Sequence, residues 1–121
     1  MRLFVSLGAT FAGLAVAFGA FGAHALRATL SPEDLVTFEI GVRYQMYHAL
    51  ALFVVAWATT HWSSAALTAA GWSFVVGIVV FSGSLYVLVL TGQRWLGAVT
   101  PLGGMAFLVG WVLLAWTAVR S

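Results

Sequence analysis

The chain contains no cysteine, and charged residues make up only 7% of its 121 positions. Without cysteine the protein has no disulfide, no thiolate metal ligand and no cysteine nucleophile. The basic residues are all arginine, and the formal net charge is +2 at pH 7. Nucleic-acid binding needs a clustered basic face, which so small and scattered a charge does not supply. We therefore expect no nucleic-acid partner.

What the chain has in excess is apolar sequence, at 63% of its residues. Four apolar runs fill most of the chain, and each comes close to the roughly 20 residues that a helix needs to cross a bilayer. The runs occupy residues 3–26, 44–60, 65–90 and 96–119. They predict an all-α fold in which residues 1–121 form a single domain, an integral membrane bundle of four transmembrane helices. Four spans would place both termini on one side of the membrane.

The clearest local signal is the Ser-Pro-Glu-Asp sequence at residues 31–34. Serine caps a helix N-terminus, proline suits the first helical position, and acidic side chains favour the positive end of the helix dipole. We expect the second helix to begin here and to extend the second span by an amphipathic N-terminal segment. Glu39 and Arg43 lie four residues apart on this segment, a spacing at which they can pair.

The start of the fourth helix allows two interpretations. Thr100 and Pro101 read as a cap followed by a first-turn proline, which predicts that the helix begins there. Alternatively, the helix begins at Leu96 and bends at Pro101. In either case a short loop over residues 91–95 separates it from the third span.

Small residues recur along the first apolar run at spacings of three and four, which places them on one face of a helix. Such residues let helix backbones approach closely in lipid, where no hydrophobic force drives association. We favour packing against the other spans of the same chain, and a dimer seam is the alternative. The predicted packing positions are Gly8, Ala12, Ala15, Gly19 and Gly22 in the first span and Gly103 and Gly110 in the fourth.

The most polar membrane segment covers residues 43–48. Tyr44 and His48 lie one helical turn apart, and Gln45 lies close to the same face. Polar side chains at membrane depth are costly and usually face the bundle interior. His24 ends the first span on the side of the membrane where the second span begins, so it could come near His48.

Three interpretations of these polar residues are open. We favour hydrogen-bonded packing between helices. The second is a binding site for a lipid headgroup or a quinone near His24 and His48. The third is ligation of haem or a metal by the two imidazoles, for which the sequence offers no further ligand spacing. We therefore predict no cofactor and no metal.

A second polar group lies inside the third span, at Ser82, Ser84 and Tyr86. Their hydroxyl groups are expected to bond backbone carbonyls or neighbouring helices. Neither serine has a histidine or an acid beside it in sequence, so a serine nucleophile would need a partner from another span. We expect that the protein is not an enzyme.

Asp, Glu and Lys are missing from the middle of every apolar run. Proton-coupled transporters usually rely on such an ionisable group at membrane depth. The absence argues against a small proton-driven exporter. A small channel or transporter is retained as the second alternative, after the binding module.

Four stretches of the chain together resemble one family. Residues 19–26 read GAFGAHAL, residues 41–50 read GVRYQMYHAL, residues 81–86 read FSGSLY, and TPLGG at 100–104 is followed by Gly110-Trp111. These motifs resemble the small bacterial membrane proteins of domain-of-unknown-function family 423, whose eukaryotic relatives are similar to transmembrane protein 256. The resemblance covers essentially the full chain. It implies four spans in the bacterial inner membrane, with both termini in the cytoplasm.

The resemblance implies no established activity, so it assigns no catalytic residue. Its polar motif positions, together with Glu39, define a candidate polar cluster. We expect a structural or accessory component of a membrane complex, surrounded by the lipid bilayer, with a homo-oligomer or a larger assembly as its partner. The cluster consists of His24, Glu39, Arg43, Tyr44, Gln45, His48, Ser82, Ser84, Tyr86 and Thr100.

Overall fold

The structure, a computed structural model, describes residues 2–120 and is helical apart from short turns. This part of the chain contains no β-strand, as the predicted all-α fold requires. Its α-helices are α1 (Arg2–His24), α2 (Pro32–Ala58), α3 (Ala65–Gly77), α4 (Gly83–Thr91) and α5 (Thr100–Arg120).

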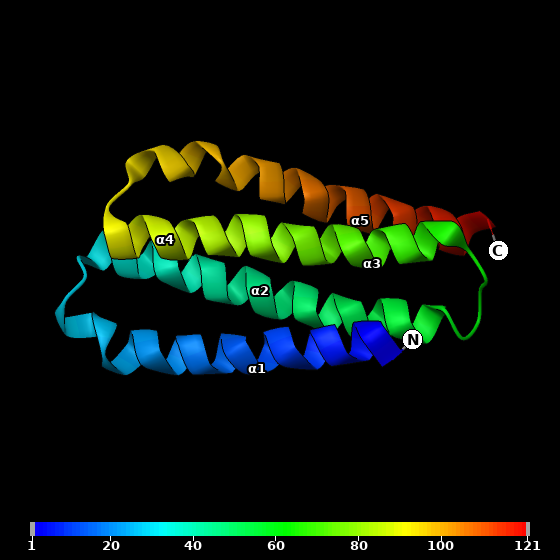
Figure 1. The fold of residues 1–121 in the computed structure, drawn as a ribbon, viewed down its shortest axis with the longest axis horizontal. Coiled ribbons are helices and arrows are strands. Elements are labelled where there is room, and N and C mark those ends of the chain that lie inside the picture. The colour runs from blue at the N-terminus through cyan, green and yellow to red at the C-terminus, as the bar shows by residue number, and fades with distance from the viewer. Residues whose placement is uncertain (1, 121) are drawn as a thin grey trace.

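Three shorter segments connect or extend these helices: the 3-10 helices η1 (Leu26–Ala28) and η3 (Arg94–Ala98), and the π-helix η2 (Ile78–Ser82). Because η2 joins α3 directly to α4, the three form one continuous rod (Figure 1). Four rods therefore lie lengthwise, and the start of α1 and the end of α5 are at the same end of the molecule. α1 packs on α2, α2 on α3 and α4, and α3 on α5.

Three of the rods are long and apolar enough to cross a membrane, namely Arg2–His24, Ala65–Thr91 and Arg94–Arg120. The described residues thus form a helical membrane protein with three candidate spans. The predicted span within α2 is not among them. The reason is chemical: residues 33–48 of α2 include four charged side chains, an amide and an imidazole, which lower the mean hydropathy of the helix. These are Glu33, Asp34, Glu39, Arg43, Gln45 and His48.

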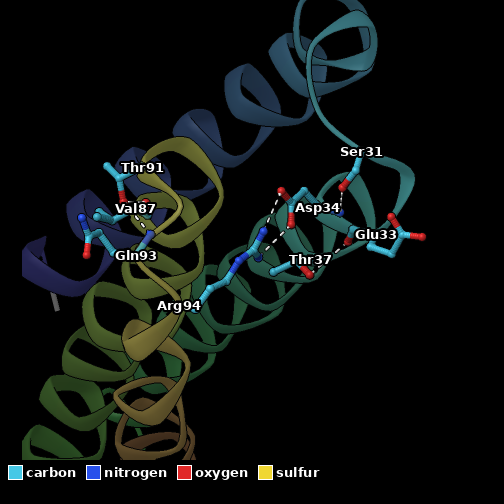
Figure 2. A network of polar contacts seen from close by, with 8 residues as sticks. All are labelled: Ser31, Glu33, Asp34, Thr37, Val87, Thr91, Gln93 and Arg94. Atoms are coloured by element: carbon cyan, nitrogen blue, oxygen red, sulfur yellow. Dashed lines mark hydrogen bonds and ion pairs between the residues drawn. The ribbon is translucent and has the colours of Figure 1, made fainter.

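The start of α2 confirms the predicted cap. Ser31 has extended backbone dihedrals, and its side chain accepts a hydrogen bond of 3.1 Å from the backbone N–H of Asp34. The spacing of Glu39 and Arg43 would allow them to pair, but they form no ion pair in the structure. Within residues 2–120 the one ion pair joins Asp34 to Arg94, whose guanidinium donates two hydrogen bonds of 3.0 and 3.3 Å to the carboxylate (Figure 2). This pair ties the start of α2 to the segment that precedes α5.

α5 follows the first of the two predicted alternatives, because it begins at Thr100 and Pro101 occupies its first turn. Leu96 belongs to the separate 3-10 helix η3. Between α4 and η3 the chain reverses at Gly92, whose φ of 75° lies in the left-handed region that glycine adopts without strain.

The π-helix η2 has no counterpart in the sequence prediction. Its hydrogen bonds span five residues rather than four, so it changes the direction in which the following side chains point. Apolar periodicity carries no signal for such a turn, because Ile78–Ser82 reads as an ordinary stretch of an apolar helix. The turn contains Phe81, against which α5 packs, and Ser82, which contacts α2.

The small-residue stripe of α1 faces α2, in agreement with the favoured intramolecular packing. A Cβ atom added to Gly8 would lie 3.0 Å from the carbonyl oxygen of Ala49, and one added to Gly22 would lie 2.8 Å from the ring of Phe38. Gly19 faces Val42 in the same way. Along this stripe Ala15 is 1% exposed and Ala12 is partly buried.

The glycines of α5 pack against the α3–η2–α4 rod. Gly110 lies under Phe74, and a Cβ at Gly103 would collide with the backbone nitrogen of Phe81. Backbone atoms move less readily than a side chain does, so an added methyl group at Gly103 would force α5 and the π-helical turn apart. The main core of the bundle includes Phe4, Leu52, Val55, Phe74, Ile78 and Phe107.

We predict that Gly103→Ala lowers the thermal unfolding midpoint of the protein in detergent. Overpacking of a tight contact typically costs about 1–3 kcal/mol. Gly13→Ala is the matched control, because nothing lies within 4 Å of the added Cβ on α1. Circular dichroism melts would measure both variants. Equal midpoints for the two would show that the α5–η2 contact is looser than described.

Candidate functional site

A set of polar side chains links the rods to one another inside the bundle. We call it the interhelical network. Its bonds connect α2 to α1, to the α3–η2–α4 rod and to α5, and it also joins α4 to α5. Its members are Gln45, His48, Ser82, Ser84, Tyr86, Thr100 and Trp111.

Gln45 is the member that joins three rods. It is 2% exposed, and its Nε2 donates a hydrogen bond of 2.8 Å to the backbone oxygen of Phe11 on α1. Its Oε1 accepts a hydrogen bond of 2.6 Å from the hydroxyl of Tyr86 on α4. The ring of Tyr86 in turn packs against Phe18 and Phe38, so the hydroxyl is held in place by its aromatic neighbours.

His48 joins α2 to α5. Its Nδ1 lies 2.8 Å from the backbone oxygen of Tyr44, and Trp111 Nε1 donates a hydrogen bond of 3.0 Å to its Nε2. A carbonyl oxygen only accepts and an indole N–H only donates, so these partners fit a neutral imidazole protonated at Nδ1. The ring stacks on Phe107 with centroids 3.6 Å apart and an interplanar angle of 7°. In this tautomer Nε2 is the one acceptor of the ring, and its lone pair already accepts the hydrogen bond from Trp111.

The hydroxyl groups of the third rod bond as the sequence predicts. Ser82, at 0% exposure, donates a hydrogen bond of 2.6 Å to the backbone oxygen of Gly41 on α2. Ser84 and Thr100 share a hydrogen bond of 2.6 Å between their hydroxyl oxygens, which joins α4 to α5. These partners are a carbonyl and another hydroxyl, and neither can act as the general base that a serine nucleophile needs.

The two histidines do not come together, in contrast to the approach considered from the sequence. Gly22, near the end of α1, packs on Phe38. Phe38 precedes His48 by ten residues, and His24 lies two residues beyond Gly22 in the other direction. The two histidines are therefore about 18 Å apart along the bundle at 1.5 Å per residue. His24 is exposed, whereas His48 is buried against α5. Within residues 2–120 no group of three His, Asp or Glu side chains could hold a metal ion.

Tyr44 contributes its ring rather than its hydroxyl. It is 38% exposed, and the ring packs against Phe81 with centroids 4.9 Å apart. The backbone oxygen of the same residue accepts the hydrogen bond from His48. Tyr44 thus lies at the edge of the interhelical network, between α2 and the π-helical turn.

Glu39 and Arg43 lie outside the network, on the opposite side of α2. Both line a cleft of about 200 Å³ between α1 and α2, whose floor includes Gly19 and Phe38. A second cleft of about 350 Å³ shares Glu39 with the first and extends it to Arg27. We call the two together the α1–α2 cleft.

Trp111 is not among the site residues predicted from the sequence. The available signal was its place in the Gly110-Trp111 motif, because a partly buried indole N–H usually finds an acceptor. The Asp34–Arg94 ion pair was also missed. It joins residues 60 positions apart, and sequence spacing alone does not predict such a contact.

The buried polar groups are fully paired. Among the described residues, every buried side-chain nitrogen or oxygen atom has a hydrogen-bond partner within the chain. An unpaired polar group in hydrocarbon is expensive, so this pairing stabilises the bundle. Each buried nitrogen or oxygen atom of the interhelical network thus makes at least one hydrogen bond within the chain.

Comparison with known proteins gives consistent results. Residues 18–104 match the family model described as "Protein of unknown function (DUF423)". The chain is 49% identical over 121 residues to the UPF0382 membrane protein YwdK of Bacillus subtilis, covering 99% of this chain and 98% of that protein. It is 46% identical over 114 residues to the UPF0382 membrane proteins SAB0533 of Staphylococcus aureus and SH2409 of Staphylococcus haemolyticus, each covering 94% of this chain and 93% of the relative. No solved structure matches the chain.

We predict that Gln45 and Tyr86 act as a coupled pair in a double-mutant cycle. Gln45→Leu and Tyr86→Phe should each destabilise the protein, and the double variant should lose less than the sum of the two. Interhelical hydrogen bonds in membranes give coupling energies of about 1 kcal/mol. Unfolding in mixed detergent micelles would measure the free energies.

The control for this cycle pairs Gln45→Leu with Ser73→Ala. Ser73 donates a hydrogen bond of 2.8 Å to Ala69 within its own helix α3 and shares no partner with Gln45. These two changes should be additive. Additivity of Gln45→Leu with Tyr86→Phe as well would contradict the bond between α2 and α4.

Proposed function

We propose that this chain, which belongs to the family of membrane proteins of unknown function called DUF423, is a four-span helical scaffold with a structural or accessory role in a membrane complex. The single observation that carries the proposal is the complete pairing of the buried polar groups. A catalytic or transport site keeps some polar groups available for its substrate, whereas within residues 2–120 every buried side-chain nitrogen or oxygen atom has a hydrogen-bond partner in the chain.

Burial supports α2 as the fourth span. α2 packs against α1 on one side and the α3–η2–α4 rod on the other. Two polar residues near the middle of α2 face these neighbours rather than lipid: Gln45 is 2% exposed and His48 is 5% exposed. Its outward residues in the same region include the apolar Leu50 and Val54. A hydropathy average treats buried and lipid-facing residues alike, and therefore underestimates how well this helix suits a bilayer.

The length of α2 fits a span with an extension. Its 27 residues measure about 40 Å at 1.5 Å per residue, compared with a hydrocarbon core of about 30 Å. The excess of about 10 Å corresponds to roughly the first seven residues. That segment carries Glu33 and Asp34, and the Asp34–Arg94 ion pair would then lie at the membrane surface.

The alternatives have less support. Haem ligation by His48 would require the ring to give up its hydrogen bond with Trp111, and His24 lies too far away to serve as a second ligand. A channel or transporter needs a polar path through the bundle, yet its centre is filled by Leu52, Leu67 and Phe74, each at 0% exposure. We propose that the protein is not an enzyme.

We propose the bacterial cytoplasmic membrane as the location, with both termini in the cytoplasm. The relatives are named as membrane proteins of Bacillus and Staphylococcus species. The orientation rests on the family resemblance and on charge. Arg2 and Arg120 belong to the end with the termini, whereas the arginines at the opposite end share it with all three acidic residues of the chain.

Four spans predict that successive loops lie on opposite sides of the membrane. Because the chain has no cysteine, a single introduced thiol gives an unambiguous label. In intact cells, a membrane-impermeant maleimide should label Thr29→Cys in the first loop and leave Ser63→Cys in the second loop unlabelled until the cells are opened. Labelling of both positions from outside would contradict a span in α2.

A scaffold or accessory role predicts that the protein exists in an assembly. Native mass spectrometry after gentle release from the source membrane should give either a multiple of 12.9 kDa or that mass plus a foreign subunit. The first result indicates a homo-oligomer and the second an accessory subunit. A bare monomer under every release condition would contradict the proposal.

A further inference from the structure

The α1–α2 cleft combines an apolar floor with charged side chains. Gly19 and Gly22 leave the α1 wall without side chains, and Leu35, Phe38 and Val42 form the α2 wall. The wider part of the cleft continues past Pro32 to the connection between the two helices. A shallow apolar surface of this kind suits an acyl chain or a glycerol backbone.

The charges of this cleft have no partner within the chain. Within residues 2–120 the one ion pair is Asp34–Arg94, at a different place in the fold. Glu39, Arg43 and Arg27 all line the cleft, and none of them makes a hydrogen bond or an ion pair there. Glu39 and Arg43 are one helical turn apart, a spacing at which they could pair, yet they stay separate.

The depth of these residues makes an unpaired charge costly. If the end of α2 at Ala58 lies at one boundary of the hydrocarbon, a core of about 30 Å ends about twenty residues earlier, near Glu39. Arg43 then lies about 6 Å inside that boundary, where an isolated charge is unfavourable. A ligand from the bilayer that carries both signs of charge would compensate these side chains.

We propose that the α1–α2 cleft binds phosphatidylethanolamine, with the ammonium group on Glu39 and the phosphate on Arg43 and Arg27. The headgroup carries a negative phosphate next to a positive ammonium group. Arg43 and Glu39 offer the complementary charges, positive for the phosphate and negative for the ammonium. Guanidinium groups bind phosphate through charge-assisted hydrogen bonds, and a primary ammonium donates hydrogen bonds to a carboxylate.

The carboxylate selects among phospholipids. Phosphatidylcholine carries a quaternary ammonium, which has no N–H to donate to Glu39. Phosphatidylglycerol supplies the phosphate without a cation, so the charge of Glu39 would remain uncompensated. The inference rests on the proposed four-span arrangement, because that arrangement puts the cleft at the bilayer interface.

The test is retention of lipid by the full-length protein. The protein is reconstituted in vesicles of equal parts phosphatidylethanolamine, phosphatidylglycerol and phosphatidylcholine, released gently, and weighed by native mass spectrometry. Wild type should retain phosphatidylethanolamine. Glu39→Gln and Arg43→Gln should each lower its retention about tenfold, as expected for loss of one charge-assisted hydrogen bond.

Two further variants keep the test independent of folding. Gly19→Leu fills the cleft without changing a charge, and because the Cβ position at Gly19 meets Val42 at an ordinary 3.5 Å, the helices need not separate. It should also lose the lipid. Arg2→Gln removes an arginine from the opposite end of the bundle and should retain it. Thermal melts would identify any variant whose fold has changed. Lipid retention would then be compared between wild type and the variants that melt like wild type.

Several results would overturn the inference: no retained lipid on wild type, equal retention of phosphatidylcholine, preference for phosphatidylglycerol, or equal loss in Arg2→Gln. Failure of the proposed four-span arrangement would be distinguishable from these results. If cysteine labelling places α2 across the membrane but no lipid is retained, only the lipid site is wrong. If labelling places both loops on one side, the four-span arrangement is wrong, whatever the lipid result.

Discussion

The cost of an unpaired polar group in hydrocarbon is the constraint on which the rest of this structure depends. Gln45 and His48 make α2 the most polar of the long helices at membrane depth. The bundle accommodates them by hydrogen bonds to neighbouring helices: Gln45 bonds to Phe11 and Tyr86, and His48 Nε2 accepts from Trp111. The residues that make α2 a poor span by hydropathy are therefore those that fix its place among the others.

Close packing makes these hydrogen bonds attainable. The interhelical bonds of 2.6 to 3.0 Å require helix backbones that approach closely, and glycine permits this at Gly8 against α2 and at Gly103 against the π-helical turn. The π-helical turn itself carries Ser82, whose hydroxyl donates to the backbone of Gly41. Glycine packing and hydrogen bonding thus depend on each other. If the helices moved apart at the glycines, the hydrogen bonds between them would lengthen.

Two groups of polar residues in the chain have different consequences. Those of the interhelical network are buried and bonded within the chain, which suits a scaffold. Those of the α1–α2 cleft, Glu39, Arg43 and Arg27, face outward without partners, which suits a ligand from the surrounding bilayer. Arg43, Gln45 and His48 lie close together along the chain, so the sequence alone places them in one polar segment. On the helix, these side chains point to different sides.

The sequence by itself determined the class of the protein and the start of α2. Long apolar runs in a chain with 7% charge require a membrane environment, and local rules place the cap at Ser31, because a cap depends on neighbours within one turn. For the last helix the sequence left two starts open, Leu96 and Thr100, and in the structure the helix begins at Thr100. The tertiary structure decided which polar residues meet. Partners such as His48 and Trp111, 63 positions apart, and the π-helical turn depend on the rotation of each helix against its neighbours, and no local pattern encodes that rotation.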